Sequence, residues 1–241
     1  HWSTNRTGDW PEMRVFAFDH RIQLEEMADE AGVSHERLGP FKELCLKAAL
    51  RVADGRPGYG ILCDGRFGRD ALYAATGTGL WIGRPVELPG SRPLETEAEI
   101  GPDFGGLGEW PVDNVVKVLC FYHPDDAAAM RADQEATVSR LFSAARRNGL
   151  EFLLEVIPSK VAATDDDTTA AIIDRFYEIG VYPDWWKLEP MKSAEAWEKA
   201  CAAITRHDPH VRGIVVLGLD APAAELKESF ATAAEFDLVK G

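Results

Sequence analysis

The chain has 241 residues, of which 46% are hydrophobic and 27% charged, a composition that excludes disordered and fibrous proteins. Lys and Arg number 26 against 40 Asp and Glu, which gives a net charge of −14. This excess of acid argues against a surface that binds nucleic acid or an anionic membrane, although a local basic pocket for a small anion is still allowed. No apolar run approaches the roughly 18 residues of a membrane span, and no secretory leader is recognisable.

The four cysteines lie far apart and form no Cys-x-x-Cys pair: Cys45, Cys63, Cys120 and Cys201. Scattered cysteines of this kind are typical of reduced thiols in the core of a cytoplasmic protein. We therefore expect a cytoplasmic location and four free thiols.

Short runs of β-branched and aromatic residues recur along the chain, and helical patterns follow them. Strands are expected at residues 14–20, 59–64, 80–83, 114–122, 152–157, 185–189 and 212–218, with an eighth beginning at 237–241. Strands that are apolar on both faces and alternate with amphipathic helices indicate a parallel sheet covered by helices. The pattern predicts an α/β protein with a (β/α)₈ TIM barrel whose eighth βα unit is incomplete in this chain.

Residues 13–241 are expected to form this single barrel domain, and residues 1–12 a linker or the cut end of an excised piece. The rival architecture, a doubly wound open sheet, needs a glycine-rich loop after its first strand, and residues 18–23 contain no glycine. Residues 88–113 read as a long loop. One helical face is predicted to be buried between the first two strands: Phe41, Leu44, Cys45, Ala48, Ala49 and Val52.

Three successive strands each hold one ionisable residue within an apolar run, namely Lys117, Glu155 and Lys187. Burying an unpaired charge costs several kcal/mol or more, so these side chains are expected to contact one another. A lysine in a dry pocket beside a second cation can attack a carbonyl as an amine, and a nearby carboxyl can carry protons. The pattern suggests Schiff-base chemistry; a buried structural Lys–Glu network is the alternative.

Two further acids, Asp19 and Asp64, lie where the first and second strands meet their loops, on the presumed active face. The alternative for each is a helix N-cap or a loop ion pair. Arg21, Arg66 and Arg84 are candidates for holding anionic substrate groups, because a guanidinium pairs well with carboxylate or phosphate.

A metal site built from His20, His123 and nearby carboxylates is also conceivable, as in a metal-dependent barrel aldolase or hydrolase. No His-x-His or His-Glu-x-x-His spacing supports it. We therefore expect neither a metal nor another cofactor.

Five longer strings resemble the aldolase domain of inositol catabolism, a relative of the class I tagatose-bisphosphate-type aldolases that is often fused to a sugar kinase. They are Phe-Asp-His-Arg-x-Gln-Leu (18–24), Trp-Ile-Gly-Arg-Pro-Val-Glu (81–87), Tyr-His-Pro-Asp-Asp (122–126), Pro-Asp-Trp-Trp-Lys-Leu-Glu-Pro (183–190) and Leu-Gly-Leu-Asp-Ala-Pro (217–222). Shorter segments, Ala17-Phe-Asp-His-Arg21 and Ile61–Gly68, look like the first two strand ends of the wider class.

The resemblance implies cleavage of 5-dehydro-2-deoxy-D-gluconate 6-phosphate into dihydroxyacetone phosphate and malonate semialdehyde. It implies that Lys187 forms the Schiff base, that Glu155 is the base, and that Lys117 and Asp19 assist. The residues expected to bind substrate are Arg21, Asp64, Arg84, His20, Gly218 and Asp220.

A sugar-acid phosphate is therefore the expected partner, together with a fused or separate sugar kinase domain, and a homo-oligomer is left open. The alternative from another class is a non-catalytic barrel that binds a sugar phosphate or regulates a kinase.

Overall fold

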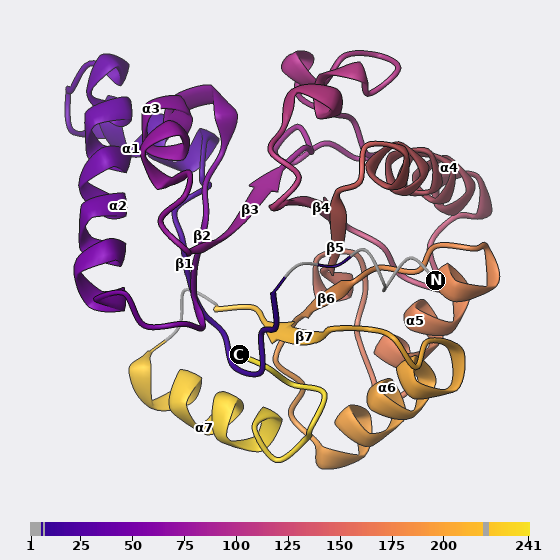
Figure 1. The fold of residues 1–241 in the computed structure, drawn as a ribbon. Coiled ribbons are helices and arrows are strands. Elements are labelled where there is room, and N and C mark those ends of the chain that lie inside the picture. Colours follow the sequence, from indigo (N-terminus) through magenta and orange to yellow (C-terminus); the bar gives the residue numbers. More distant parts are fainter. Residues whose placement is uncertain (1–5, 7, 219–221) are drawn as a thin grey trace.

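The structure is a computed structural model that describes residue 6 and residues 8–218 and 222–241. Within these residues, seven parallel strands pair in chain order into one curled sheet (Figure 1). The strands are β1 (Arg14–Ala17), β2 (Tyr59–Leu62), β3 (Trp81–Pro85), β4 (Asn114–Cys120), β5 (Glu151–Val156), β6 (Trp185–Leu188) and β7 (Gly213–Val216). Each lies where the apolar runs predicted it, although most are a few residues shorter.

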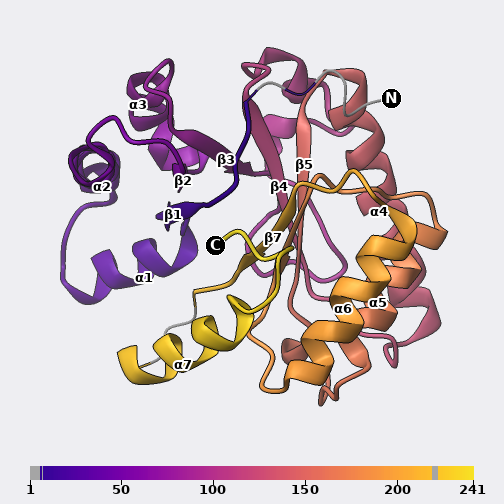
Figure 2. The ribbon, with the colours of Figure 1, turned by 60° about the horizontal axis from the view of Figure 1, so that its bottom comes forward.

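Helices surround the outside of this sheet (Figures 1 and 2). The α-helices are α1 (Ile22–Glu30), α2 (Leu38–Ala53), α3 (Gly65–Ala75), α4 (Ala128–Arg147), α5 (Thr168–Glu178), α6 (Ala194–His207) and α7 (Ala223–Ala233). Short 3₁₀ helices are η2 (His35–Arg37), η3 (Ala98–Ile100), η4 (Gly105–Glu109) and η5 (Pro158–Lys160). Between β3 and β4 the expected long loop replaces an α-helix, and it contains η3 and η4.

Residues 238–241 connect the two edges of the sheet. The backbone N–H of Ile214 in β7 donates to the carbonyl of Leu238 at 2.7 Å, and the N–H of Met13, just before β1, donates to the carbonyl of Lys240 at 2.6 Å. Figure 2 shows this end of the chain between β1 and β7. The arrangement is consistent with a TIM-like barrel with an incomplete eighth unit, as the sequence predicts.

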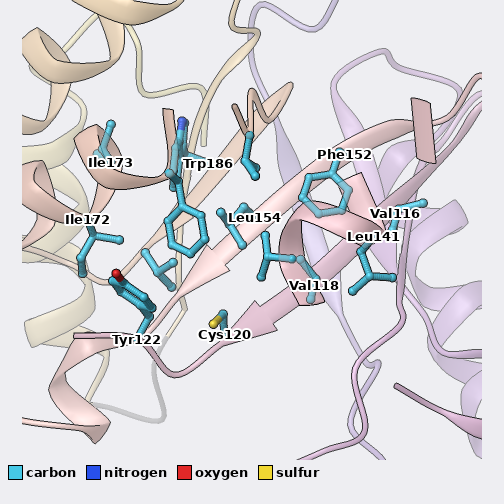
Figure 3. Close-up of a cluster of buried hydrophobic side chains, with 14 of the residues drawn as sticks. Val116, Val118, Cys120, Tyr122, Leu141, Phe152, Leu154, Ile172, Ile173 and Trp186 are labelled. Atoms are coloured by element: carbon cyan, nitrogen blue, oxygen red, sulfur yellow. The ribbon is translucent and has the colours of Figure 1, made fainter. Parts of the chain in front are cut away.

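Side chains alternate between the two faces of each strand, because successive residues of a strand point to opposite sides. Figure 3 shows the outer face, where β4, β5 and β6 pack against helices. Its labelled residues, all buried, are Val116, Val118, Cys120, Tyr122, Leu141, Phe152, Leu154, Ile172, Ile173 and Trp186. Trp185 faces the other way and joins the inner cluster with Trp81 and Leu153. The inner face is therefore apolar at the start of the strands, and Lys117 points inward from between two outward valines.

The buried face of α2 differs from the prediction. Cys45 and Ala49 are buried as expected, but Phe41, Leu44 and Val52 are 46%, 61% and 59% exposed, and Ala48 is exposed as well. The buried residues of the helix are Leu38, Lys42, Cys45, Leu46, Ala49 and Ala53. The helix is rotated because the Lys42 ammonium reaches inward to carbonyl oxygens and a carboxylate, contacts that an apolar pattern does not reveal.

The four cysteine thiols are free, as expected: three are buried, and that of Cys201 is partly exposed. Among the described residues, no helix has both the length and the apolar character needed to cross a bilayer.

Two leucines of α2 test this rotation. Leu46 is 2% exposed and Leu44 61% exposed. Leu46→Ala is expected to lower the free energy of unfolding by about 2–5 kcal/mol, since it removes buried methyl groups and leaves a cavity. Leu44→Ala should change it by less than about 0.5 kcal/mol. Urea denaturation measures both, and equal losses in the two variants would contradict the observed orientation of the helix.

Candidate active site

Lys117 lies at the centre of a buried group of charges inside the curled sheet. Its ammonium nitrogen is 2.9 Å from Oε1 of Glu87, 3.0 Å from Oε2 of Glu155 and 3.5 Å from Oδ2 of Asp19. Burial alone would lower the pKa of Lys117, but the three carboxylates raise it well above its usual value. Lys117 is therefore held as an ammonium ion.

Glu155 connects this lysine to the second one. Lys187 is paired with Glu155 in the register of β5 and β6, and its Nζ lies 2.9 Å from Oε1 of Glu155. Burial acts to raise the pKa of Glu155, but the charges and hydrogen bonds of the two lysines outweigh it and lower the pKa below its ordinary value. The glutamate is an anion shared by two amines, as the spacing on three successive strands predicts.

Asp19 follows the end of β1 and completes the group. Burial acts to raise its pKa, but Lys117 and Lys187, together with His20 and Arg21, lower it below the usual range of an aspartate. The carboxylate is ionised and lies 3.5 Å from the Lys117 ammonium. The sequence-predicted set Lys117, Glu155, Lys187 and Asp19 is thus assembled in one place.

A cavity of about 520 Å³ opens above these residues, at the carboxyl ends of the strands. This volume lies within the usual range for a small-molecule site. Its floor is apolar and includes Trp81, Leu153 and Val215. Polar side chains and two glycines are also part of the lining: Asp19, His20, Arg21, Gln23, Glu87, Gly90, Lys117, Glu155, Lys187 and Gly218.

Arg21 lines the cavity, but its guanidinium is already engaged by this chain. Nη1 donates to the backbone carbonyl of Glu87 at 2.8 Å and to Oε1 of Glu97 at 3.2 Å, and Nη2 donates to Oε1 of Glu87 at 2.9 Å. The sequence suggested that this guanidinium holds a substrate anion. In the structure its two terminal nitrogens are instead hydrogen-bonded within the protein. Arg21 instead joins the end of β1 to the loop after β3.

Glu87 was missed by the sequence reasoning. Its two carboxylate oxygens accept hydrogen bonds from Lys117, from Arg21 and from the backbone N–H of Leu119, the last at 3.1 Å. A signal was present, because Glu87 is an even number of residues from Trp81 and so shares its inward face. Glu87 lies beyond the predicted end of the strand at residue 83, so the strand pattern alone assigns it no role.

Asp64 does not line the cavity. One of its oxygens accepts a hydrogen bond from Phe67 N at 2.8 Å and caps α3, and the other is paired with Lys42. Lys42 also donates to the carbonyls of Phe18 at 2.9 Å and His20 at 2.8 Å. The helix-cap alternative therefore describes Asp64, and its expected role in binding substrate is not supported by its position.

Arg84 also lies away from the charged group. It points to the outer side of β3, where its guanidinium carbon is 3.9 Å from the centre of the Trp110 ring, and it lines a separate cavity. Arg66 is paired with Glu25 near the surface. His20 and Gly218 do line the main cavity, whereas Asp220 lies outside the described residues.

His123 ties two loops together. Its Nε2 donates to the carbonyl of Ala163 at 3.1 Å, and its Nδ1 accepts from Asp125 N at 3.1 Å. Within the described part of the chain, no three His, Cys, Asp or Glu side chains have the geometry of a metal site.

The curled parallel sheet, with helices outside and charged side chains inside, defines an α/β protein with a TIM-like barrel fold. The chain belongs to the family described as "Uncharacterized protein conserved in bacteria (DUF2090)", which matches residues 1–241. A comparison with curated protein sequences finds no match.

Two solved structures are similar. One is Cgl0159 from Corynebacterium glutamicum (Brevibacterium flavum), with 16% identity, 100% of this chain and 82% of that chain covered, and a TM-score of 0.59. The other is a fructose-bisphosphate aldolase from Slackia heliotrinireducens, with 15% identity, coverage of 93% and 72%, and a TM-score of 0.58. At these identities the likeness is one of fold.

Removal of the central ammonium should destabilise the fold. Lys117→Met leaves buried carboxylates without their main partner and is expected to lower the free energy of unfolding at pH 7.5 by about 3–5 kcal/mol. Lys47→Met, at an exposed position of α2, should have an effect of less than about 0.5 kcal/mol.

The loss should also depend on pH. Carboxylates with lowered pKa stabilise the folded state above their unfolded pKa, near 4, and this contribution is lost as the pH falls. In Lys117→Met, protonation of Asp19 and Glu155 relieves the unpaired charge instead. The difference from wild type should therefore narrow between pH 7.5 and pH 4.5 in urea titrations, and a constant difference would contradict the assigned charges.

Proposed function

We propose that this protein is a class I aldolase, which cleaves a carbon–carbon bond through a Schiff base on Lys187. The observation that carries the proposal is the unequal environment of two buried lysines that share Glu155 in one cavity. Lys117 contacts three carboxylates, whereas the described residues give Lys187 one. Lys187 can become a neutral, nucleophilic amine by passing one proton to Glu155, whereas three carboxylates keep Lys117 charged.

The reaction follows from this arrangement. The Lys187 amine adds to a substrate ketone, and loss of water leaves an iminium ion. Glu155 takes the proton of the hydroxyl group two carbons from the iminium carbon. The bond between that hydroxyl carbon and the carbon next to the iminium then breaks; its electrons form the carbon–carbon double bond of an enamine, and the electrons of the C=N double bond return to the nitrogen. The hydroxyl carbon leaves as an aldehyde. Protonation of the enamine and addition of water then release the second product and restore Lys187.

The remaining charges support these steps. Lys117, 3.0 Å from Glu155, stabilises the carboxylate and any oxyanion formed beside it. Asp19 lies 3.5 Å from Lys117 and lines the cavity, where it can contact substrate hydroxyls. His20, Gln23 and Gly218 line the wider part of the cavity, and we assign them to the anionic ends of the substrate.

We infer that the substrate is 5-dehydro-2-deoxy-D-gluconate 6-phosphate, as the resemblance of the five sequence strings implies. Attack at its C5 ketone and cleavage between C3 and C4 give dihydroxyacetone phosphate and malonate semialdehyde, a step of myo-inositol catabolism in the cytoplasm. The fold likeness to a fructose-bisphosphate aldolase, whose name denotes another sugar phosphate, agrees with this class of substrate. The proposal includes a (β/α)₈ barrel and a sugar kinase domain as fused or separate partner.

Borohydride trapping tests the chemistry. Wild-type protein treated with dihydroxyacetone phosphate and sodium borohydride should gain the mass of the reduced adduct, and peptide mapping should place it on Lys187. Lys187→Met should lose both the adduct and turnover. Glu155→Gln should still form adduct from dihydroxyacetone phosphate but slow cleavage by about 10²–10⁴-fold, because the base is missing.

The alternatives give different results. A non-catalytic sugar-phosphate barrel forms no adduct, and a metal-dependent aldolase loses its activity in EDTA, which a Schiff-base enzyme tolerates. If the adduct maps to Lys117 and still forms in Lys187→Met, the assignment is wrong: Lys117 is then the Schiff-base lysine and Lys187 the assisting one.

A further inference from the structure

Glu87 has no role in the proposed reaction, yet both oxygens of its carboxylate are hydrogen-bonded within the protein. It is buried, its Oε1 lies 2.9 Å from both Lys117 Nζ and Arg21 Nη2, and its Oε2 accepts from the backbone N–H of Leu119 at 3.1 Å. Its own backbone carbonyl accepts from Arg21. Every polar atom of the side chain is thus in use.

The backbone next to Glu87 is hydrogen-bonded to β4 and to the segment around Glu97. Val86 N donates to the carbonyl of Lys117 itself at 3.0 Å, and Glu97 N donates to the carbonyl of Val86 at 2.9 Å. Residue 87 also forms an antiparallel bridge with Thr96. The carboxylate therefore reaches Lys117 from a rigid support, without the entropy cost of a mobile loop.

We infer that Glu87 is a positioning residue that keeps Lys117 an ammonium ion and so leaves Lys187 as the one reactive amine of the pair. The inference rests on the proposed Schiff-base chemistry and goes beyond it, because it explains why two adjacent buried lysines do not both react with a carbonyl.

The charge balance supports this role. Lys117 faces Asp19 from the end of β1, Glu87 from the segment after β3 and Glu155 from β5. Asp19 is the most distant of the three, at 3.5 Å, and Glu155 is shared with Lys187. Without Glu87, two buried ammonium groups would share the remaining two carboxylates. Burial favours a neutral amine, so Lys117 would then compete for the same chemistry.

Glu97 provides a control for Glu87, because it also contacts Arg21 and lies in the same segment. It accepts from Arg21 at 3.2 Å and adds a second carboxylate to that guanidinium, but no contact joins it to Lys117. Arg21 thus contacts both Glu87 and Glu97, whereas Lys117 contacts only Glu87 of these two. Glu97→Gln removes a charge from the same segment while leaving the Glu87–Lys117 pair in place.

The first experiment traps Schiff bases with dihydroxyacetone phosphate and borohydride. The amine and the ketone condense with loss of water, and hydride reduces the iminium to a secondary amine, which peptide mapping locates. Lys187→Met alone and Lys187→Met/Glu97→Gln should give no adduct. Lys187→Met/Glu87→Gln should give adduct on Lys117.

The second experiment does not depend on aldolase chemistry. Competitive labelling with trace acetic anhydride between pH 7 and pH 10, followed by peptide mass spectrometry, measures how reactive each amine is. Lys117 should be unreactive in wild type and in Glu97→Gln. In Glu87→Gln its labelling at pH 8 should rise at least about tenfold, which corresponds to one pKa unit.

The outcomes separate the two proposals. Wild-type adduct on Lys187 with no adduct or labelling of Lys117 in the Glu87→Gln variants overturns the role of Glu87 and leaves the aldolase intact. Increased labelling of Lys117 without any wild-type adduct supports the effect of Glu87 on the amine but overturns the Schiff-base function. If Glu87→Gln does not fold, Glu87→Asp withdraws the charge by one methylene and should give intermediate labelling; labelling equal to wild type contradicts the inference.

Discussion

The carboxylate of Glu155 lies between two lysine side chains, and the rest of the site depends on keeping it there. Three neighbouring strands must hold their register, because a slip by one residue would turn each of these side chains toward the helices. The outer valines, leucines and tryptophan of β4–β6 supply that register by packing against α4, α5 and α6. The charged group is therefore held by the apolar layer on the opposite face of the same strands.

Most of the fold and the centre of the site follow from the sequence. Strands buried on both faces give continuous apolar runs, so the seven strands and residues 237–241 stand out. A single charge within such a run, as at Lys117, Glu155 or Lys187, is costly enough to require a partner. Since parallel neighbours point their side chains the same way, the three could be placed together without knowing any distance.

The rest depends on contacts between segments far apart in the chain. Nothing near Arg21 in sequence reveals that Glu87 and Glu97 occupy its guanidinium. The rotation of α2 is set by Lys42, whose acceptors lie on two other elements. Apolar periodicity places a helix but not its rotation when a buried lysine competes with leucine for the inner face, and charge alone does not separate a substrate-binding arginine from a structural one.

The hydrogen bonds of residues 238–241 to β7 and to Met13 have a consequence for how the protein is made. β4, β5 and β6 are consecutive, so Lys117, Glu155 and Lys187 can come together as soon as these strands have left the ribosome. Met13 can find its partner at Lys240 only when all the residues between them have been synthesised, and pairings between such distant segments form slowly. The lysine pair can therefore assemble before the cavity around it is closed.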